Sequence, residues 1–218
     1  MRRPEIVGEL MQLLQAANWM RPHLPCFAEV KTPLQALMDE RLVGARRTKQ
    51  VATRKPLSNE DWRPERARSW EAVRRLVKCL VQRCYPKPGW RMLMFSDASD
   101  LFWGCCVTQV CDETYARGGP VPEMCHEALV FVSRVFKGSQ LNWPTVDKEG
   151  YAIVATFQRL EYLLWGGVHI FCDLRNLAYI FNPETCRGVV PKATSQRLER
   201  WRTFLSQYRF TIMHIHRE

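Results

Sequence analysis

The chain has 218 residues, of which 46% are hydrophobic and 25% are charged, a composition typical of a folded globular protein. No apolar run approaches the roughly 18 residues that would cross a membrane, and no small-residue cleavage site follows the basic start. We therefore expect neither a membrane partner nor a signal peptide.

The formal net charge of +10 is distributed unevenly along the chain. Residues 1–89 hold 18 Lys/Arg and 9 Asp/Glu, whereas residues 90–218 hold 14 and 13. A basic first part predicts a surface that contacts nucleic acid, and a solvated basic face without a partner is the alternative. The nine cysteines include no CxxC pair, so a zinc ribbon is not expected. Their odd number without a secretion signal favours a reducing, intracellular setting.

The first part of the chain has helical patterning. Residues 1–42 contain apolar positions at i, i+3, i+4 and i+7 spacing and predict a small, mostly helical segment. Residues 43–64 are polar and strongly basic, which predicts a linker or exposed loop. Residues 65–89 predict a connecting helix that ends at the PKPG breaker, and this breaker marks the domain boundary. Five basic side chains are our candidates for nucleic-acid contacts: Arg46, Arg47, Lys49, Arg54 and Lys55.

The pattern changes to that of a sheet after this boundary. We predict strands at 90–96, 102–110, 128–134, 168–172 and 209–215, and helices at about 145–164, 174–181 and 193–208. This order, with a tight turn between the first two strands, indicates a mixed five-stranded sheet with flanking helices, an α/β domain over residues 90–218.

Three acidic residues stand at informative places in this pattern. Asp97 and Asp173 each close an apolar strand, and Glu149 lies in the first turns of the long helix. A carboxylate beside a buried strand is costly to desolvate unless a cation or hydrogen bonds compensate. Three convergent carboxylates repel one another, and hard divalent cations relieve that repulsion. Each acid could also be only a cap, a turn former or a surface charge.

Helical geometry distinguishes Glu149 from its neighbour Asp147. Glu149 lies at the edge of the apolar stripe of the helix, whereas Asp147 is about 200° away around the axis. We expect Asp147 to face elsewhere and to favour the helix dipole from the first turn, with Thr145 as the N-cap. Asp100 is expected to be a turn residue of the hairpin.

At these acids the chain resembles the RNase H domain of reverse transcriptases from Ty3/gypsy-type LTR retrotransposons. The block FSDASDLFWGCCVTQV is similar to the first two strands of that domain. The blocks LNWPTVDKEGYAIVATFQRLEYLLWGGVHIFCDLRNLAYIF and RLERWRTFLSQYRFTIMHIHRE resemble its catalytic helix, next strand, late helix and final strand. Upstream, LMQLLQAANWMRPHLPCFAEVKTPLQALM resembles the thumb or connection segment that follows the polymerase palm.

The resemblance implies an RNase H-like fold and a ribonuclease H-type endonuclease within a reverse transcriptase polyprotein. The implied reaction is hydrolysis of the RNA strand of an RNA–DNA hybrid, with two Mg²⁺ or Mn²⁺ ions held by Asp97, Glu149 and Asp173. The implied partners are the hybrid, or another nucleic acid, and the polymerase part of the same polyprotein. The implied location is the cytoplasm, in a retroelement particle, or the nucleus.

Three departures from the family pattern leave the activity of the chain open. The sequence contains no YxDD motif, so reverse transcription by this chain alone is not expected. The fourth acid of the family lies in a helix after the final strand, and we expect a domain that lacks this helix because the sequence ends at Glu218. Gly150 stands where the family has a larger residue. The alternatives are a non-catalytic nucleic-acid-binding or connection-like module and a decayed remnant without activity.

Overall fold

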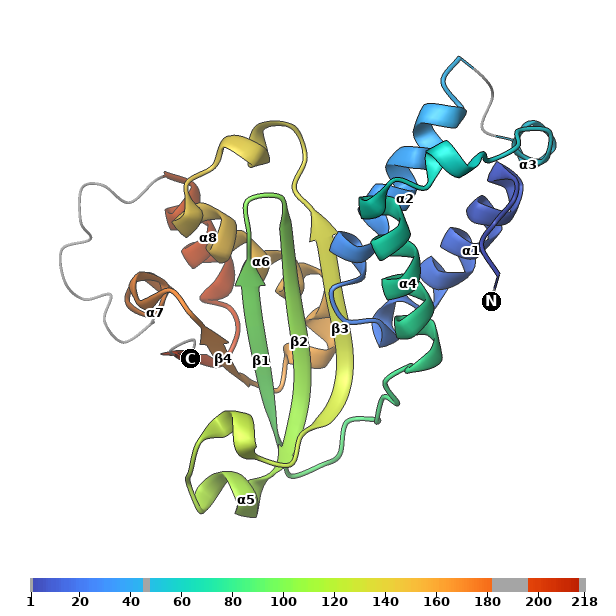
Figure 1. Cartoon of the computed structure of the whole chain (residues 1–218). Coiled ribbons are helices and arrows are strands. Elements are labelled where there is room, and N and C mark those ends of the chain that lie inside the picture. Colours follow the sequence, from blue (N-terminus) through green and yellow to red (C-terminus); the bar gives the residue numbers. More distant parts are fainter. Residues whose placement is uncertain (1, 45–47, 182–195, 216–218) are drawn as a thin grey trace. The chain divides into compact units, whose positions relative to one another are not determined.

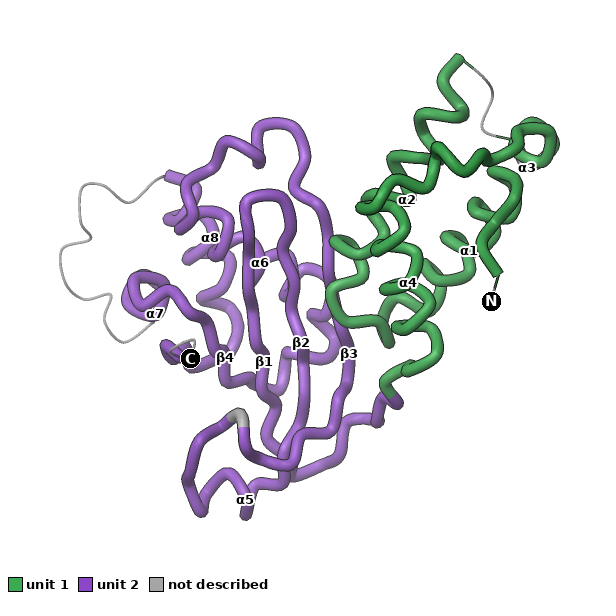
Figure 2. The backbone as a smooth tube through the Cα atoms, viewed as in Figure 1, with its two compact units in different colours: residues 1–81 green, residues 82–218 purple. Residues whose placement is uncertain are grey.

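The structure, a computed structural model, describes residues 2–44, 48–181 and 196–215. The chain divides into two compact units, Met1–Val81 and Gln82–Glu218 (Figure 2). Among the described helices, none combines the length and the apolar character needed to cross a membrane.

The first unit is a helical assembly around an apolar core. Its helices are α1 (Val7–Trp19), α2 (Phe27–Arg41), α3 (Lys49–Thr53) and α4 (Pro64–Lys78) (Figure 1). Leu10, Leu34, Leu37 and Trp70 are buried at the centre, where α1, α2 and α4 meet. The apolar spacing predicted within residues 1–42 therefore forms a helix-on-helix interface.

The basic segment that we predicted as a linker or exposed loop is partly folded. Helix α3 begins after Thr48, whose side chain accepts a hydrogen bond from the Val51 N–H at 3.4 Å. Ala52 is fully buried and packs in a small cluster with Val7 and Leu42. The polar composition of residues 43–64 gave no sign of this helix, because the burial of one small apolar residue, Ala52, is enough to hold its single turn in place.

The predicted connecting helix also differs from the structure. Helix α4 ends at Lys78, and the chain that follows contains no helix up to β1. In the second unit the Cys84 N–H donates to the Ala128 carbonyl at 2.8 Å, so this stretch runs in extended form beside a strand. Backbone pairing with that strand replaces the helical hydrogen bonds.

The second unit contains the predicted mixed sheet, in the order β3-β2-β1-β4-β5. Its elements are β1 (Trp90–Ala98), β2 (Phe102–Cys111), α5 (Asp112–Ala116), β3 (Glu127–Val135), α6 (Thr145–Leu164), β4 (Val168–Cys172), α7 (Arg175–Phe181), α8 (Gln196–Leu205) and β5 (Phe210–His214). The β1–β2 and β2–β3 pairs are antiparallel, and the β1–β4 and β4–β5 pairs are parallel. The fold prediction is confirmed, with most boundaries within two residues.

The two faces of the sheet are covered by different elements. Alternate residues such as Met94 and Ile170 point into a large core with Ile153 and Phe157 of α6, and α8 packs on α6. On the other face, Leu93 packs in a smaller cluster that includes residues of α5 and of the loop after it. The helix α6 is thus held against the sheet along its length, and this fixes where its polar residues emerge.

Candidate metal centre

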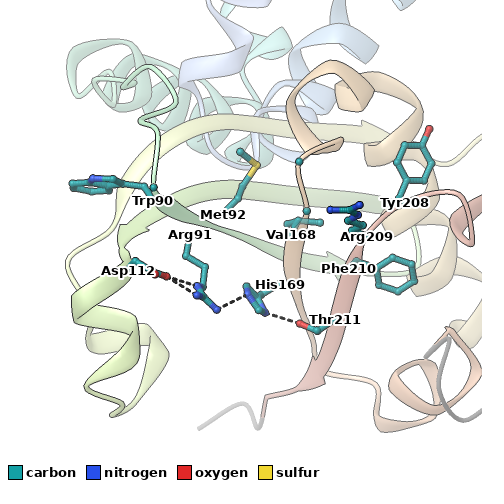
Figure 3. A pocket seen from close by; sticks show the side chains of 13 residues that line it. Trp90, Arg91, Met92, Asp112, Val168, His169, Tyr208, Arg209, Phe210 and Thr211 are labelled. Atoms are coloured by element: carbon teal, nitrogen blue, oxygen red, sulfur yellow. Dashed lines mark hydrogen bonds and ion pairs between the residues drawn. The ribbon is translucent and has the colours of Figure 1, made fainter.

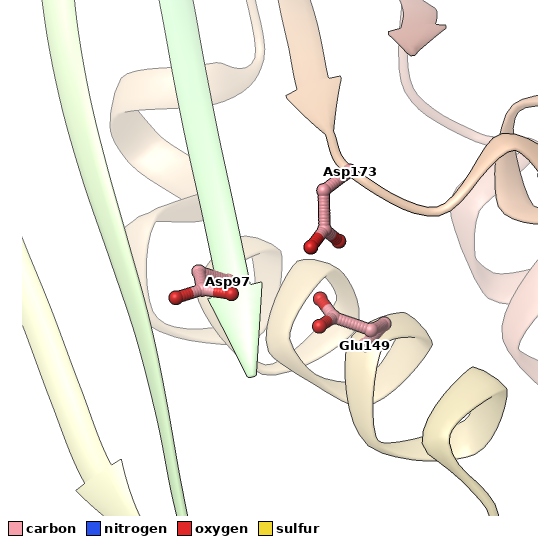
Figure 4. Close-up of side chains that lie close together, drawn as sticks. All are labelled: Asp97, Glu149 and Asp173. Atoms are coloured by element: carbon pink, nitrogen blue, oxygen red, sulfur yellow. The ribbon is translucent and has the colours of Figure 1, made fainter. Parts of the chain in front are cut away.

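The three predicted carboxylates meet at one end of the sheet (Figure 4). Asp97 lies near the end of β1, Asp173 directly follows β4, and Glu149 comes from the second turn of α6. One oxygen of each carboxylate lies within 4.8 Å of those of the other two. Glu149 is buried, Asp173 is half-buried and Asp97 is exposed, so the cluster faces solvent on one side.

Strand register brings the two aspartates together. Phe95 of β1 is paired with Phe171 of the parallel strand β4, and each aspartate lies two positions further along its own strand. The parallel pairing of β1 and β4 therefore brings Asp97 and Asp173 to the same end of the sheet. Carboxyl ends of parallel strands are where open α/β sheets collect ligands.

Glu149 is held to the end of β1 by its own side chain. The Ala98 N–H donates to Glu149 Oε1 at 3.0 Å. The next residue, Gly150, allows close packing on α6, because a Cβ at this position would lie 3.2 Å from Phe181 Cζ and 3.3 Å from Leu198 Cδ2. This close approach of α7 and α8 leaves little room for a larger side chain at position 150.

Asp147 faces away from the cluster, as the helical geometry predicted, and its side chain is buried. It is ion-paired with Arg197 of α8, and the Arg197 guanidinium carbon lies 4.0 Å from the centre of the Trp143 ring. The predicted N-cap is displaced by one residue: Thr145 is the first helical residue and Pro144 takes the cap position. Arg197 was not identified from the sequence, because nothing local connects residues 50 positions apart.

Lys148 is a second residue that the sequence did not single out. Its side chain is 7% exposed, and Nζ lies 3.3 Å from Asp100 Oδ1 and 5.9 Å from the centre of the Phe136 ring. Asp100, which was predicted as a turn residue, lies in the connection between β1 and β2 and is almost fully exposed. Lys148 therefore links the start of α6 to the turn that follows Asp97.

The donor set fits a hard divalent cation. All three ligands are carboxylate oxygens from separate elements, the chemistry that Mg²⁺ and Mn²⁺ prefer. The Cys172 thiol, next to Asp173 in the chain, does not change this preference for a hard cation. Burial, together with the charges of Glu149 and Asp173, raises the pKa of Cys172 to about 11, so its sulfur remains a protonated thiol at neutral pH.

The five basic residues that we predicted to contact nucleic acid belong to the first unit, whereas the three carboxylates belong to the second. Arg54 and Lys55 follow α3 and are exposed. Arg46 and Arg47 lie outside the described residues, as does the side chain of Lys49.

A groove of about 570 Å³ lies at the opposite end of the sheet, where β1, β4 and β5 begin (Figure 3). Arg91 Nη2 contacts Asp112 Oδ1 at 2.6 Å, and Arg91 Nη1 lies 3.4 Å from His169 Nε2. Because a guanidinium only donates, Nε2 accepts, and Nδ1–H donates to Thr211 Oγ1 at 2.6 Å. Burial and the Arg91 charge lower the pKa of His169, which agrees with a neutral ring.

The sheet order and the acidic cluster together define a domain of the RNase H-like class. The family described as the RNase H-like domain found in reverse transcriptase matches residues 87–208, more than half of the chain. The chain belongs to this family.

Similarity to known polyproteins extends over nearly the whole chain but is distant. The enzymatic polyprotein of carnation etched ring virus is 22% identical over 215 residues, which is 98% of this chain and 28% of the polyprotein. The transposon Tf2-3 polyprotein of Schizosaccharomyces pombe is 24% identical over 217 residues, 97% of this chain and 14% of the polyprotein. The chain therefore spans well under a third of these relatives.

A solved structure shares the fold over both units. The foamy viral protease-reverse transcriptase in complex with RNA/DNA hybrid aligns with 98% of this chain and 25% of its own, at a TM-score of 0.63 and 16% identity. The same protein in complex with dsDNA gives a TM-score of 0.64 over 100% of this chain and 40% of its own. At this identity the likeness concerns the fold alone.

Proposed function

We propose that this chain is part of a reverse transcriptase polyprotein of Ty3/gypsy LTR-retrotransposon type and that it hydrolyses the RNA strand of RNA–DNA hybrids. The observation that carries the proposal is the convergence of Asp97, Glu149 and Asp173 within 4.8 Å at the end of the sheet. Family membership supports it, as does the fold shared with a reverse transcriptase in complex with RNA/DNA hybrid.

Each acid has a distinct role in this proposal. Asp97 and Asp173, at the ends of neighbouring parallel strands, would hold both Mg²⁺ or Mn²⁺ ions, and Glu149 would complete one site and orient the attacking water. Bound divalent ions supply charge stabilisation for the attacking and leaving oxygens. The hydrogen bond from the Ala98 N–H keeps the Glu149 carboxylate directed at the cluster before any ion arrives.

The first unit would act as a thumb- or connection-like segment that precedes the hydrolytic domain. We propose that its exposed basic residues, including Arg54 and Lys55, contact the phosphates of the hybrid. We extend this role to Arg46, Arg47 and Lys49 of the same basic segment. The polymerase part of the same polyprotein is the second proposed partner.

A cleavage assay tests the proposal directly. The full chain is incubated with an RNA–DNA hybrid labelled on the RNA strand, in Mg²⁺, in Mn²⁺ and in EDTA. We expect cleavage that requires a divalent ion and that falls at least about a hundredfold in Asp97→Asn and in Glu149→Gln. Asp100→Asn, which changes an exposed carboxylate close to the cluster, serves as the matched control and should retain activity.

Two outcomes would contradict this assignment. Cleavage that survives both substitutions would show that another site is responsible. Salt-dependent binding of the hybrid without any cleavage would favour the alternative, a non-catalytic nucleic-acid-binding or connection-like module. The net charge of +9 over residues 1–89 is the observation that favours this alternative.

A further inference from the structure

Two arginines come together where the edge strand β3 meets helix α6. Arg134 of β3 is half-buried, and its Nε is buried without a hydrogen-bond partner among the described residues. Arg159 of α6 is exposed. Arg134 is paired across the sheet with Trp103, which packs with Ala155 of α6, and Arg159 lies one helical turn beyond Ala155. Burial, followed by the positive charge of Arg159, lowers the pKa of Arg134, in agreement with this placement.

The apolar surroundings of this pair strengthen the repulsion between its two charges. Arg134 is paired across the sheet with Trp103, which is 4% exposed and packs with Ala152 and Ala155 of α6. Residues paired across strands share a face, so Arg134 lies beside an apolar surface. Electrostatic interactions weaken less with distance near such a surface than in open water.

Other partly buried arginines of this unit are neutralised by the chain itself. Arg91 contacts Asp112, and Arg197 contacts Asp147. Within residues 2–44, 48–181 and 196–215, no carboxylate forms an ion pair with Arg134 or Arg159. A desolvated like-charged pair costs free energy in the isolated chain, and an anion that binds both groups removes that cost.

We infer that Arg134 and Arg159 form a binding site for a backbone phosphate of a polynucleotide. The planar, forked guanidinium group suits bidentate contact with phosphate oxygens. Arg159 lies ten residues beyond Glu149 on the same helix, about 15 Å along its axis. A duplex presents phosphates about every 3.4 Å along each strand. One hybrid is therefore long enough to contact the acidic cluster and the arginine pair at the same time. The inference rests on the proposed nucleic-acid substrate and names a contact outside the acidic cluster.

The test is hybrid binding by the full chain carrying Asp97→Asn, measured from 50 to 200 mM salt in Mg²⁺. In this background we expect Arg134→Gln and Arg159→Gln each to weaken binding about tenfold at 50 mM salt. Because both groups hold one phosphate, the double variant Arg134→Gln/Arg159→Gln should lower the slope of log K against log salt by about 0.7–0.9, and each single variant should lower it by part of this amount. Arg134→Lys, which retains the charge, should restore most of the slope.

Arg117→Gln is the matched control, since Arg117 is exposed, pairs with Glu113 at 3.9 Å and carries the same charge. It should leave the slope unchanged. Melting curves without nucleic acid provide a second measurement. If the pair serves only the fold, its loss lowers the melting temperature, whereas our inference predicts no decrease, because a repulsion is removed.

The outcomes separate this inference from the proposed function. A slope that remains unchanged in both Gln variants, or a chain that does not bind hybrid at all, would overturn the phosphate site. If the wild-type chain cleaves hybrid while the Arg variants bind like their parent, the phosphate site fails and the proposed function stands. If the slope falls in the Arg variants but the wild-type chain does not cleave, the phosphate site stands and the proposed function fails.

Discussion

The two ends of the central sheet carry their charges in opposite arrangements. At the carboxyl ends of β1 and β4, Asp97, Glu149 and Asp173 place like charges within 4.8 Å of one another. At the beginnings of the same strands, Arg91 contacts both Asp112 and His169, and the charges there are neutralised within the chain. A groove of about 570 Å³ lies at this second end.

We take the balance of charges in a cluster, rather than the shape of the surface, as the better guide to a functional site. A groove whose charged groups are already paired gains little from a ligand that must displace those contacts. Three carboxylates in one place store repulsion that a divalent cation relieves. We therefore propose that the functional site lies at the acidic end.

Removal of a neutralising partner should have the largest effect on stability. Arg197→Ala takes the guanidinium away from the buried Asp147 carboxylate, and we expect a loss of about 3 kcal/mol in the free energy of unfolding. Chemical denaturation measures this loss. Arg200→Ala, on the exposed side of the same helix, should change it by less than about 0.5 kcal/mol. Equal effects of the two variants would show that the Asp147–Arg197 pair contributes little.

Divalent cations should stabilise the acidic end and leave the opposite end unaffected. We expect Mg²⁺ at ten times its dissociation constant to add about 1.4 kcal/mol to the free energy of unfolding. Asp97→Asn should raise the melting temperature of the metal-free chain, because it removes a repulsion, and should abolish the Mg²⁺ effect. Thermal melts with and without Mg²⁺ measure both changes. An equal Mg²⁺ response in Asp97→Asn would place ion binding elsewhere.

The opposite end should respond to pH through His169. Its folded-state pKa is lowered by burial and by Arg91, so the unfolded chain binds this proton first as the pH falls. The contribution of His169 to stability is therefore complete above about pH 6.5 and is lost as the pH falls through its ordinary pKa towards the lower folded value. NMR titration of the ring measures the pKa, and His169→Gln should flatten the pH dependence of stability.

Asp112→Asn sharpens this prediction. The Asp112 charge opposes the lowering of the His169 pKa, so its removal should lower that pKa further. An increase in the His169 pKa in this variant would contradict the arrangement of charges around Arg91.

The smallest effect is expected at Gly150. Alanine gains about 1 kcal/mol of helix propensity, but its Cβ would lie 3.2 Å from Phe181 Cζ and 3.3 Å from Leu198 Cδ2. The two effects should nearly cancel and leave a net change within about 1 kcal/mol in urea unfolding. A stabilisation that clearly exceeds this limit would show that α7 and α8 do not press on α6.

Most of the sheet domain could be predicted because its pattern is local. Alternating residues marked the strands, and 3.6-residue periodicity marked α6 and identified Glu149 rather than Asp147 as the acid of the carboxylate cluster. The errors occurred where a distant contact overruled local patterning. Helix α3 depends on the burial of Ala52 against Val7 and Leu42, and the chain after α4 pairs with β3 instead of continuing as helix.

The sequence by itself determined the order of the elements and the three acids, because strand ends and helical faces follow from residues adjacent in the chain. Only the tertiary structure decided which charges lie together: Arg197 contacts Asp147, Lys148 contacts Asp100, and Arg159 lies near enough to Arg134 to lower its pKa. These residues lie between 25 and 50 positions apart. Their contacts arise from the packing of α6 between the sheet and α8, and no periodicity in the sequence records that packing.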